Sequence, residues 1–287
     1  MSRTPPRPRD KYGARGDKQG TLVQYVRIRR ACEHAGCSLC GLETHLAESA
    51  IPDFVRQELA ALELALPDEV LPALARYLDL LLEANETTNL TAVRDRDAAW
   101  SRLIIDSLTV LPGLDMLDPA SHVIDIGTGG GMPGIPIAIA RPNLNVTLLE
   151  STGKKVRLLE QFIDQLSLSN VQAIQQRAET LAHNEKHRAM YDAAVSRAIG
   201  RMSAVLEYSL PLLKVGGRVL AMKGPRLETE LDEAGDALDI LGAGDLQVID
   251  AYPEGFDNDL VIASILKQRP TPDRYPRNAS QMRQKPL

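Results

Sequence analysis

A glycine-rich stretch between an apolar run and a helical pattern is the part of the sequence best suited to hold a ligand. Residues 127–131 read GTGGG and follow the apolar run HVIDI at 122–126. Glycine allows a tight turn and lets a ligand approach the backbone closely. Ligands of open α/β sheets bind beyond the carboxyl ends of the strands. A plain strand-to-helix turn rarely needs four glycines in five positions, so we interpret this stretch as a binding turn.

Two carboxylates and the glycine spacing indicate which ligand the turn holds. Asp125 begins the pattern D-x-G-x-G-x-G, which is typical of S-adenosylmethionine sites and contains Gly127 and Gly129. Glu150 ends the next apolar run, where a carboxylate accepts both hydroxyls of a ribose. NAD also carries a ribose, but the spacing departs from G-x-G-x-x-G, and the body of the chain has no second glycine fingerprint. The expected cofactor is therefore S-adenosyl-L-methionine.

Two cations at strand ends are the candidate catalytic residues. Arg197 ends the expected strand YDAAVSR, and Lys223 stands at the end of GGRVLAMKG. Because the carboxyl ends of parallel strands share one edge of a sheet, both side chains are expected to face the same crevice. A guanidinium binds guanine O6, a phosphate or a carboxylate, whereas the alternative for Arg197 is a surface ion pair. Lys223 suits a phosphate or a guanine, and its alternative is a solvated lysine.

Alternating periodicities predict the scaffold that positions these residues. Helical patterns at 52–62, 67–86 and 95–111 predict a helical N-terminal subdomain over 51–118. Residues 119–268 alternate apolar strands with helices, which predicts an α/β fold with a mostly parallel sheet covered on both faces. The expected strands are 122–126, 145–150, 171–176, 191–197, 216–224, 246–252 and 260–268, and the expected helices are 132–140, 153–166, 203–213 and 226–241.

The last two strands are joined by PEGFDND, which is too short for a parallel crossover, so we expect an antiparallel pair. Five strand–helix units followed by such a pair form the Rossmann-like sheet of the class I methyltransferases. The antiparallel last strand separates this plan from a sheet that is parallel throughout.

The two ends of the chain are basic although the 287-residue chain carries a net charge of −5. Residues 1–30 carry +7 and residues 267–287 carry +5, so the remaining residues carry −17. We expect residues 1–50 to be a disordered basic extension and residues 269–287 a basic tail, both able to meet a polyanion or to remain solvated.

The positions of the cysteines and the hydropathy of the chain indicate the expected cellular compartment. Cys32, Cys37 and Cys40 all lie in the basic extension, which fits a reducing cytoplasm. A zinc site with His34 or His45 is the alternative, but no metal is expected. No apolar run reaches the ~18 residues that span a bilayer, and the basic N-terminal stretch has no apolar h-region, so we expect neither a signal peptide nor a membrane partner.

Several motifs together resemble one family. The segments NLT, GTGGGMPG, SRA, MKGP and YPR, spread over about residues 68–287, are similar to the bacterial ribosomal RNA small subunit methyltransferase G family (RsmG), also called glucose-inhibited division protein B (GidB). The resemblance implies methylation of N7 of one guanine in 16S rRNA with S-adenosylmethionine. The implied partner is 16S rRNA or the small ribosomal subunit, and the expected state is a monomer.

The resemblance also implies cofactor contacts on this chain. They are Gly127, Met132, Glu150, Ser151, Thr152, Ala178, Glu179 and Arg197, with Ala178 and Glu179 beside the adenine. The family has Arg-His before the DS motif, whereas this chain has Arg102 followed by Leu103. The consequence of that departure is open at this stage.

Further polar residues are candidate RNA contacts. Lys154 and Lys155 open a helix in STGKKVR, where phosphate contacts and a solvated face are equal alternatives. Arg274 and Arg277 flank Tyr275 and suggest a clamp on the RNA backbone with a stacking ring. The candidate RNA-binding residues are Asn89, Arg102, Lys154, Lys155, Arg274 and Arg277.

The residues present fit methylation of guanine N7 better than other base methylations. N7 carries a lone pair and no proton, so positioning suffices and no general base is needed. Methylation of cytosine C5 needs a Cys nucleophile, and methylation of exocyclic amines commonly uses an Asn/Asp-Pro-Pro-aromatic motif, which AVSRAIG lacks.

Two other functions remain open at this stage. One is methylation of a small molecule or protein, and a small-molecule enzyme would not need the basic ends. The other is a non-catalytic ribosome-assembly factor that keeps the cofactor site. Asp125, Glu150 and Arg197 argue against the assembly factor, whereas Leu103 leaves it open.

Overall fold

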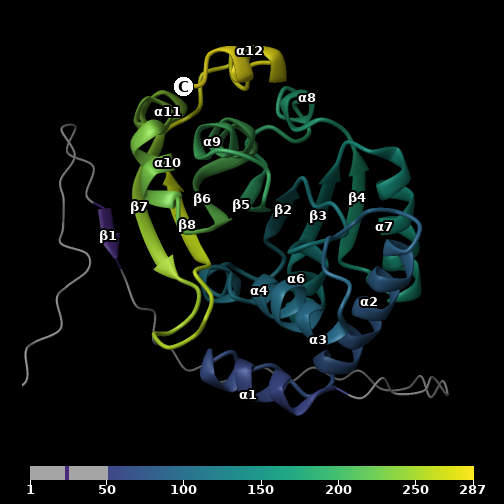
Figure 1. The fold of residues 1–287 in the computed structure, drawn as a ribbon. Helices are drawn as coiled ribbons and strands as arrows, with labels where there is room; N and C mark the ends of the chain where they lie inside the picture. The colour runs from purple at the N-terminus through teal and green to yellow at the C-terminus, as the bar shows by residue number, and fades with distance from the viewer. Residues whose placement is uncertain (1–22, 26–50) are drawn as a thin grey trace, which may run out of the picture.

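The scaffold is one twisted sheet with helices on both faces (Figure 1). A computed structural model describes residues 23–25 and 51–287. The described strands follow the order β1-β7-β8-β6-β5-β2-β3-β4, and only β8 runs antiparallel to its neighbours. Their bounds are β1 Val23–Tyr25, β2 His122–Ile126, β3 Asn145–Glu150, β4 Val171–Gln175, β5 Tyr191–Arg197, β6 Leu213–Lys223, β7 Ala243–Asp250 and β8 Val261–Lys267. This arrangement confirms the predicted fold class, including the antiparallel pair β7–β8.

Helices cover both faces because alternate residues of each strand point to opposite sides. On one face Val123 and Val146 pack with α2 (Val70–Asn85), α6 (Gly134–Ala140) and α7 (Gly153–Gln165). On the other face Ile124 and Ala194 pack with α8 (Ala178–Leu181), α9 (Met202–Ser209) and α11 (Gly235–Leu241). Both faces of the central strands are therefore buried, which explains their nearly continuous apolar sequence.

The N-terminal helices share their core with the sheet. They are α1 (Asp53–Ala61), α2, α3 (Arg96–Ala99), the π-helix η1 (Trp100–Ile105), α4 (Asp106–Leu108) and α5 (Leu111–Leu114). Leu74 and Trp100, both fully buried, belong to the same cluster as Val123 of β2. The helical part predicted over 51–118 thus packs directly against one face of the sheet.

The helices expected at 132–140 and 203–213 are shorter in the structure, as α6 and α9, and two others differ in their interior. The helix expected at 95–111 begins as predicted, because the Asp95 carboxylate accepts a hydrogen bond of 2.9 Å from the Ala98 amide, but its middle is a π-helix. The helix expected at 226–241 divides into α10 (Leu227–Glu233) and α11. The division falls at Ala234 and Gly235, where glycine weakens a continuous helix.

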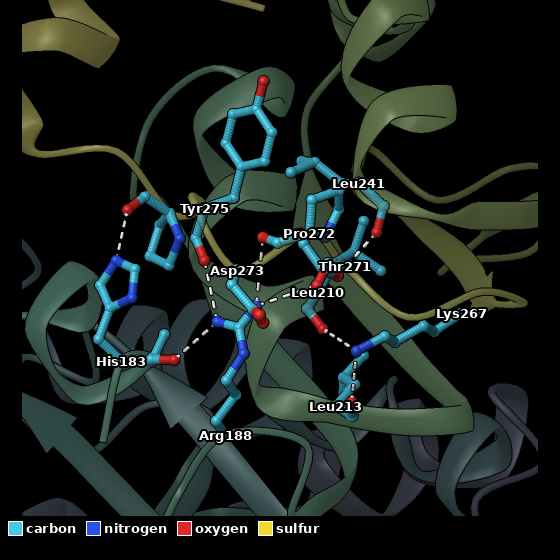
Figure 2. Close-up of polar contacts among 12 residues, drawn as sticks. His183, Arg188, Leu210, Leu213, Leu241, Lys267, Thr271, Pro272, Asp273 and Tyr275 are labelled. Atoms are coloured by element: carbon cyan, nitrogen blue, oxygen red, sulfur yellow. Dashed lines mark hydrogen bonds and ion pairs between the residues drawn. The ribbon is translucent and has the colours of Figure 1, made fainter. Parts of the chain in front are cut away.

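The basic C-terminal segment is packed onto the sheet's helices. Arg188 donates to the backbone carbonyls of Thr271 at 3.0 Å and Tyr275 at 2.9 Å, and it lies at the centre of Figure 2. Lys267 is buried at the end of β8 and donates to the carbonyls of Leu210 and Leu213. The segment ends in α12 (Ala279–Gln284) and is part of the folded body.

Most of the first 50 residues lie outside the described residues. Within them the structure describes only β1, which pairs in parallel with β7 at the edge of the sheet. The expected disordered extension, with Cys32, Cys37, Cys40 and the alternative zinc ligands, therefore lies outside the described residues apart from 23–25. Among residues 23–25 and 51–287 no helix is long and apolar enough to cross a membrane.

Candidate functional site

The glycine turn lies where the strand order of the sheet reverses. It follows β2, which has β3 on one side and β5 on the other. Gly127, Gly129 and Gly131 have φ of +71°, +62° and +106°, a region that L side chains rarely adopt. The backbone conformation thus requires the glycines, at the place where such sheets bind ligands.

Gly129 faces open space, in contrast to its neighbours. A Cβ atom at Gly127 would lie 2.6 Å from Ile199 Cγ2, and one at Gly131 would lie 2.5 Å from Ile135 Cδ1. At Gly129 the nearest atom to such a Cβ, the carbonyl oxygen of Gly127, is 3.9 Å away. Gly129 is therefore the member of the turn that a ligand can approach most closely.

Asp125 holds the turn to the following helix. Its Oδ2 accepts hydrogen bonds from the Thr128 hydroxyl at 2.6 Å and the Gly134 amide at 2.8 Å. Oδ1 is buried and has no partner among the described residues. Burial is the main cause that raises the pKa of Asp125 to about 7. The helix α6 begins at Gly134, two residues later than predicted, and the first amide of this helix is the one that donates to Asp125.

Tyr77 is a supporting residue that the sequence did not reveal. It is fully buried on α2, and its hydroxyl donates to the Gly130 carbonyl at 2.9 Å. Burial raises its pKa well above the usual range, so the hydroxyl stays a donor. The N-terminal helices thus help to hold the glycine turn, on the same face of the sheet as α6.

Glu150 ends β3 beside the glycine turn. The Gly127 and Thr128 amides both donate to the Leu149 carbonyl, at 2.9 and 3.1 Å, which ties the turn to β3. The Glu150 Oε1 accepts the Thr152 amide at 2.8 Å, which orients a nearly buried carboxylate at the carboxyl edge. This carboxylate has the position and chemistry needed to accept the two hydroxyls of a ribose.

The predicted adenine contacts lie one strand further along the same edge. The Gln176 amide, just beyond β4, donates to the Glu150 carbonyl at 3.1 Å, so β4 ends next to Glu150. Ala178 and Glu179 form the first turn of α8 and are half-buried. The C-terminal segment contacts the chain just after α8, where the Nε2 of His183 lies 2.8 Å from the Pro276 carbonyl oxygen (Figure 2).

Arg197, at the end of β5, is anchored to the π-helix region. Its Nη2 donates to the Arg102 carbonyl and lies 3.3 Å from Asp106 Oδ2. Its Nη1 is buried and has no hydrogen-bond partner among the described residues. A charged donor in that state is suited to a bound ligand. π-helical turns often occur at functional sites, and here the turn places Arg102 and Asp106 against Arg197.

Arg197 and Lys223 line the same cavity, as their strand ends predict. The cavity has a volume of about 600 Å³. The Lys223 ammonium donates to the Gly200 carbonyl and to Glu230 Oε2, the latter at 2.6 Å. The solvated-lysine alternative is therefore wrong, because the side chain is only 10% exposed and paired.

The candidate RNA contacts fall into two groups. In the first, Asn89 is exposed in a loop whose backbone is held by Asn85, and Lys154 donates to the Thr87 carbonyl of that loop at 3.1 Å. Lys155 begins α7 beside Lys154, and Arg102 is exposed on the π-helix.

The second group lies in the C-terminal segment. Arg274 is exposed and lies 5.1 Å from the centre of the Tyr275 ring, while Arg277 binds Glu207. Tyr275 is 6% exposed, so the ring predicted to stack on RNA is buried.

Sequence comparisons give the family. The profile of the family described as rRNA small subunit methyltransferase G (GidB) matches residues 70–254. A relative named "Ribosomal RNA small subunit methyltransferase G" from Moorella thermoacetica is 38% identical over 224 residues, 78% of this chain and 93% of that protein. One of the same name from Desulforamulus reducens is 39% identical and covers 81% of this chain and 97% of its own length.

The chain belongs to the rRNA small subunit methyltransferase G family. This confirms the predicted family and the prediction of a methyltransferase. The matched span of the small subunit methyltransferase G profile contains the glycine turn, Glu150, Arg197 and Lys223.

The departure from the family's Arg-His motif at Leu103 has a structural explanation. Leu103 is 3% exposed and belongs to the core formed by the N-terminal helices. Its carbonyl accepts a hydrogen bond from the Ser107 hydroxyl. An apolar residue therefore fits the position, and the neighbouring Arg102 carbonyl still reaches Arg197.

Proposed function

We propose that this chain transfers the methyl group of S-adenosylmethionine to N7 of a guanine in 16S rRNA. The observation that carries the proposal is the open Gly129 position beside the oriented Glu150 carboxylate, at the point where the strand order reverses. Family membership supports a methyltransferase, and the relatives' name supports ribosomal RNA as the substrate.

The described residues fit the cofactor. Glu150 would accept the ribose hydroxyls, Gly127 and Gly129 would lie against it, and Ala178 and Glu179 would lie beside the adenine. The remaining proposed cofactor contacts are Met132, Ser151, Thr152 and Arg197. Asp125 acts through the shape of the turn, because its Oδ2 is fully used by Thr128 and Gly134. When bound, S-adenosylmethionine supplies an electrophilic methyl group.

The chain's own residues need only bind and orient the guanine. N7 has an in-plane lone pair and no proton, so no side chain has to remove a proton, and alignment lowers the barrier. The cavity lined by Arg197 and Lys223 is of the size that holds a small ligand or a base. The Nη1 of Arg197 is buried without a partner among the described residues, and its proposed task is to donate to a ligand in this cavity.

The partner and the state of the chain follow from this activity. The proposed partner is 16S rRNA or the small ribosomal subunit, which the chain meets as a monomer in the cytoplasm. Because the greater part of the chain is acidic, local cations such as Arg102, Lys154 and Lys155 have to counter its repulsion of RNA.

Methyl transfer to defined RNA tests the proposal. Purified chain and tritiated S-adenosylmethionine are incubated with 16S rRNA or small subunits from a strain that lacks the protein, and the product is mapped by mass spectrometry. We expect one 7-methylguanine per rRNA. Methylation at another atom, or of a small molecule alone, would overturn the proposal. Binding to subunits without methyl transfer would favour an assembly factor.

A further inference from the structure

Three residues without an assigned role form a hydrogen-bonded network that reaches the Nη2 end of the Arg197 guanidinium. Asp106 begins α4 and is 6% exposed. Its Oδ1 accepts hydrogen bonds from the Tyr252 hydroxyl at 2.6 Å and from the Asn258 amide at 3.1 Å, while Oδ2 lies 3.3 Å from Arg197. Tyr252 and Asn258 both belong to the connection between β7 and β8. The network therefore joins three segments that are distant in sequence.

We propose that Asp106, Tyr252 and Asn258 are positioning residues that fix the Arg197 guanidinium for methyl transfer. This inference rests on the proposed function, because it gives Arg197 its task. None of the three is proposed to touch the reacting atoms. They act by holding one end of the guanidinium so that the other end faces the ligand.

The hydrogen bonds of Arg197 support different tasks for Nη2, which is held by the protein, and Nη1, which faces the ligand in this proposal. A guanidinium is planar, so fixing Nη2 also fixes the direction of Nη1. Nη2 is fixed by the Asp106 carboxylate and the Arg102 carbonyl. Nη1 remains buried and without a partner in the part of the chain that the structure describes.

The β7–β8 connection carries the network to the rim of the cavity. Asn258 lines the same cavity as Arg197. Its Nδ2 donates to Asp106, and its Oδ1 accepts the Leu260 amide at 3.0 Å. Both ends of this amide are therefore used, which fixes the connection and Arg197 in one arrangement.

The network also favours the ionised form of Asp106. Burial is the largest influence and leaves the pKa of this carboxyl above its usual value, whereas the hydrogen bonds of Tyr252 and Asn258 and the charges of Arg197 and Arg102 lower it in part. Burial, followed by the neighbouring Asp106 and the charge of Glu58 on α1, raises the pKa of the Tyr252 hydroxyl, so Tyr252 stays protonated and remains a donor. An ionised Asp106 is needed to hold a guanidinium, so the two neutral donors protect the ion pair.

The test compares Tyr252→Phe with wild type in single-turnover methylation of 16S rRNA from pH 5 to 9. Loss of a hydrogen bond to a charged group predicts a rate about tenfold lower near neutral pH. Removing a donor that lowers the pKa of Asp106 moves the acid limb of the profile to higher pH. Tyr191→Phe is the matched control, because this buried tyrosine bonds His187 away from the site, and its profile is expected to match wild type.

A double-mutant cycle shows whether the effect passes through Arg197. In an Arg197→Gln background, Tyr252→Phe is expected to change the rate less than about twofold, since interacting residues are not additive. Asp106→Asn serves as a second variant that removes the charge with little change in shape. Thermal unfolding verifies that each variant is folded.

Calorimetry with S-adenosylhomocysteine separates failure of this inference from failure of the proposed function. Arg197 is a predicted cofactor contact, so Tyr252→Phe is expected to weaken binding at acid pH, and Arg197→Gln to remove that pH dependence. If wild type methylates rRNA while Tyr252→Phe has the same rate and acid limb, the network is refuted and the function stands. If wild type transfers no methyl group but the calorimetric pattern is found, the function fails and the network stands.

Discussion

Arg277 binds the buried carboxylate of Glu207 through two parallel charge-assisted hydrogen bonds. Arg277 Nε lies 2.8 Å from Oε1 and Nη2 lies 2.7 Å from Oε2, and the Glu207 side chain is 1% exposed. Arg277 Nη1 donates to the Lys285 carbonyl at 2.8 Å. The sequence predicted a contact with RNA phosphates, whereas the structure uses Nε and Nη2 to attach the C-terminal segment to α9 and Nη1 within that segment.

Replacing Arg277 is therefore expected to lower stability. Arg277→Ala leaves Glu207 buried without its cation, and removing one partner of a buried pair costs about 3 kcal/mol. Urea unfolding measures this loss. Arg274→Ala is the control, because Arg274 is exposed in the loop between β8 and α12, and its expected change is below about 0.5 kcal/mol. Equal unfolding curves for wild type and Arg277→Ala would show that the ion pair does not hold the segment.

The raised pKa of Asp125 predicts that the free energy of unfolding depends on pH. Its pKa is about 7 in the folded protein, above the ordinary value of 3.8. Between these values the folded chain keeps a proton that the unfolded chain has lost, so folding stability falls as pH rises from about 4 to about 7. Asn at this position does not titrate.

We therefore expect Asp125→Asn to gain stability relative to wild type across that window, by on the order of 4 kcal/mol in total, with no further change above it. Urea unfolding of both proteins at intervals from pH 4 to 8 measures the difference. Parallel stability curves would contradict this assignment.

Gly129→Ala is expected to affect the ligand more than the fold. The added Cβ has room within the protein, so the cost to stability is that of a left-handed alanine, about 1 kcal/mol. It points into the space that a ligand would use, so affinity for S-adenosylhomocysteine should fall at least tenfold. Gly216→Ala is the control, because its φ is +91° and no atom lies within 4 Å of the added Cβ. It should lose similar stability and keep wild-type affinity in calorimetry.

Replacing Lys223 and replacing its ion-pair partner Glu230 are expected to change the rate of methylation differently. Arg197→Ala is expected to lower single-turnover methylation of 16S rRNA most. Lys223→Ala should lower it about tenfold, the loss expected for one hydrogen bond to a charged group. Glu230→Gln leaves the ammonium in the cavity and should keep the rate within about twofold. Wild-type rates for both Arg197→Ala and Lys223→Ala would mean that the active site is not at these strand ends.

The sequence by itself determined the sheet and the edge that carries the proposed ligand site. The bounds of β2, β3 and β5 follow from short apolar runs, and the glycine turn follows from a local backbone requirement. Glu150, Arg197 and Lys223 could be placed at one edge because parallel strands end on the same side. These features depend on stretches of about ten residues or fewer, so they are encoded locally.

Tertiary structure alone decided which partner each polar side chain takes. Arg277 pairs with Glu207 at a separation of 70 residues, Tyr77 with Gly130 at 53, and Asp106 with Tyr252 at 146. A charge or hydroxyl in the sequence fits a ligand contact and an internal bond equally well. The choice depends on which helices pack on which face, because burial makes an unpaired polar group costly and selects the neighbour that satisfies it.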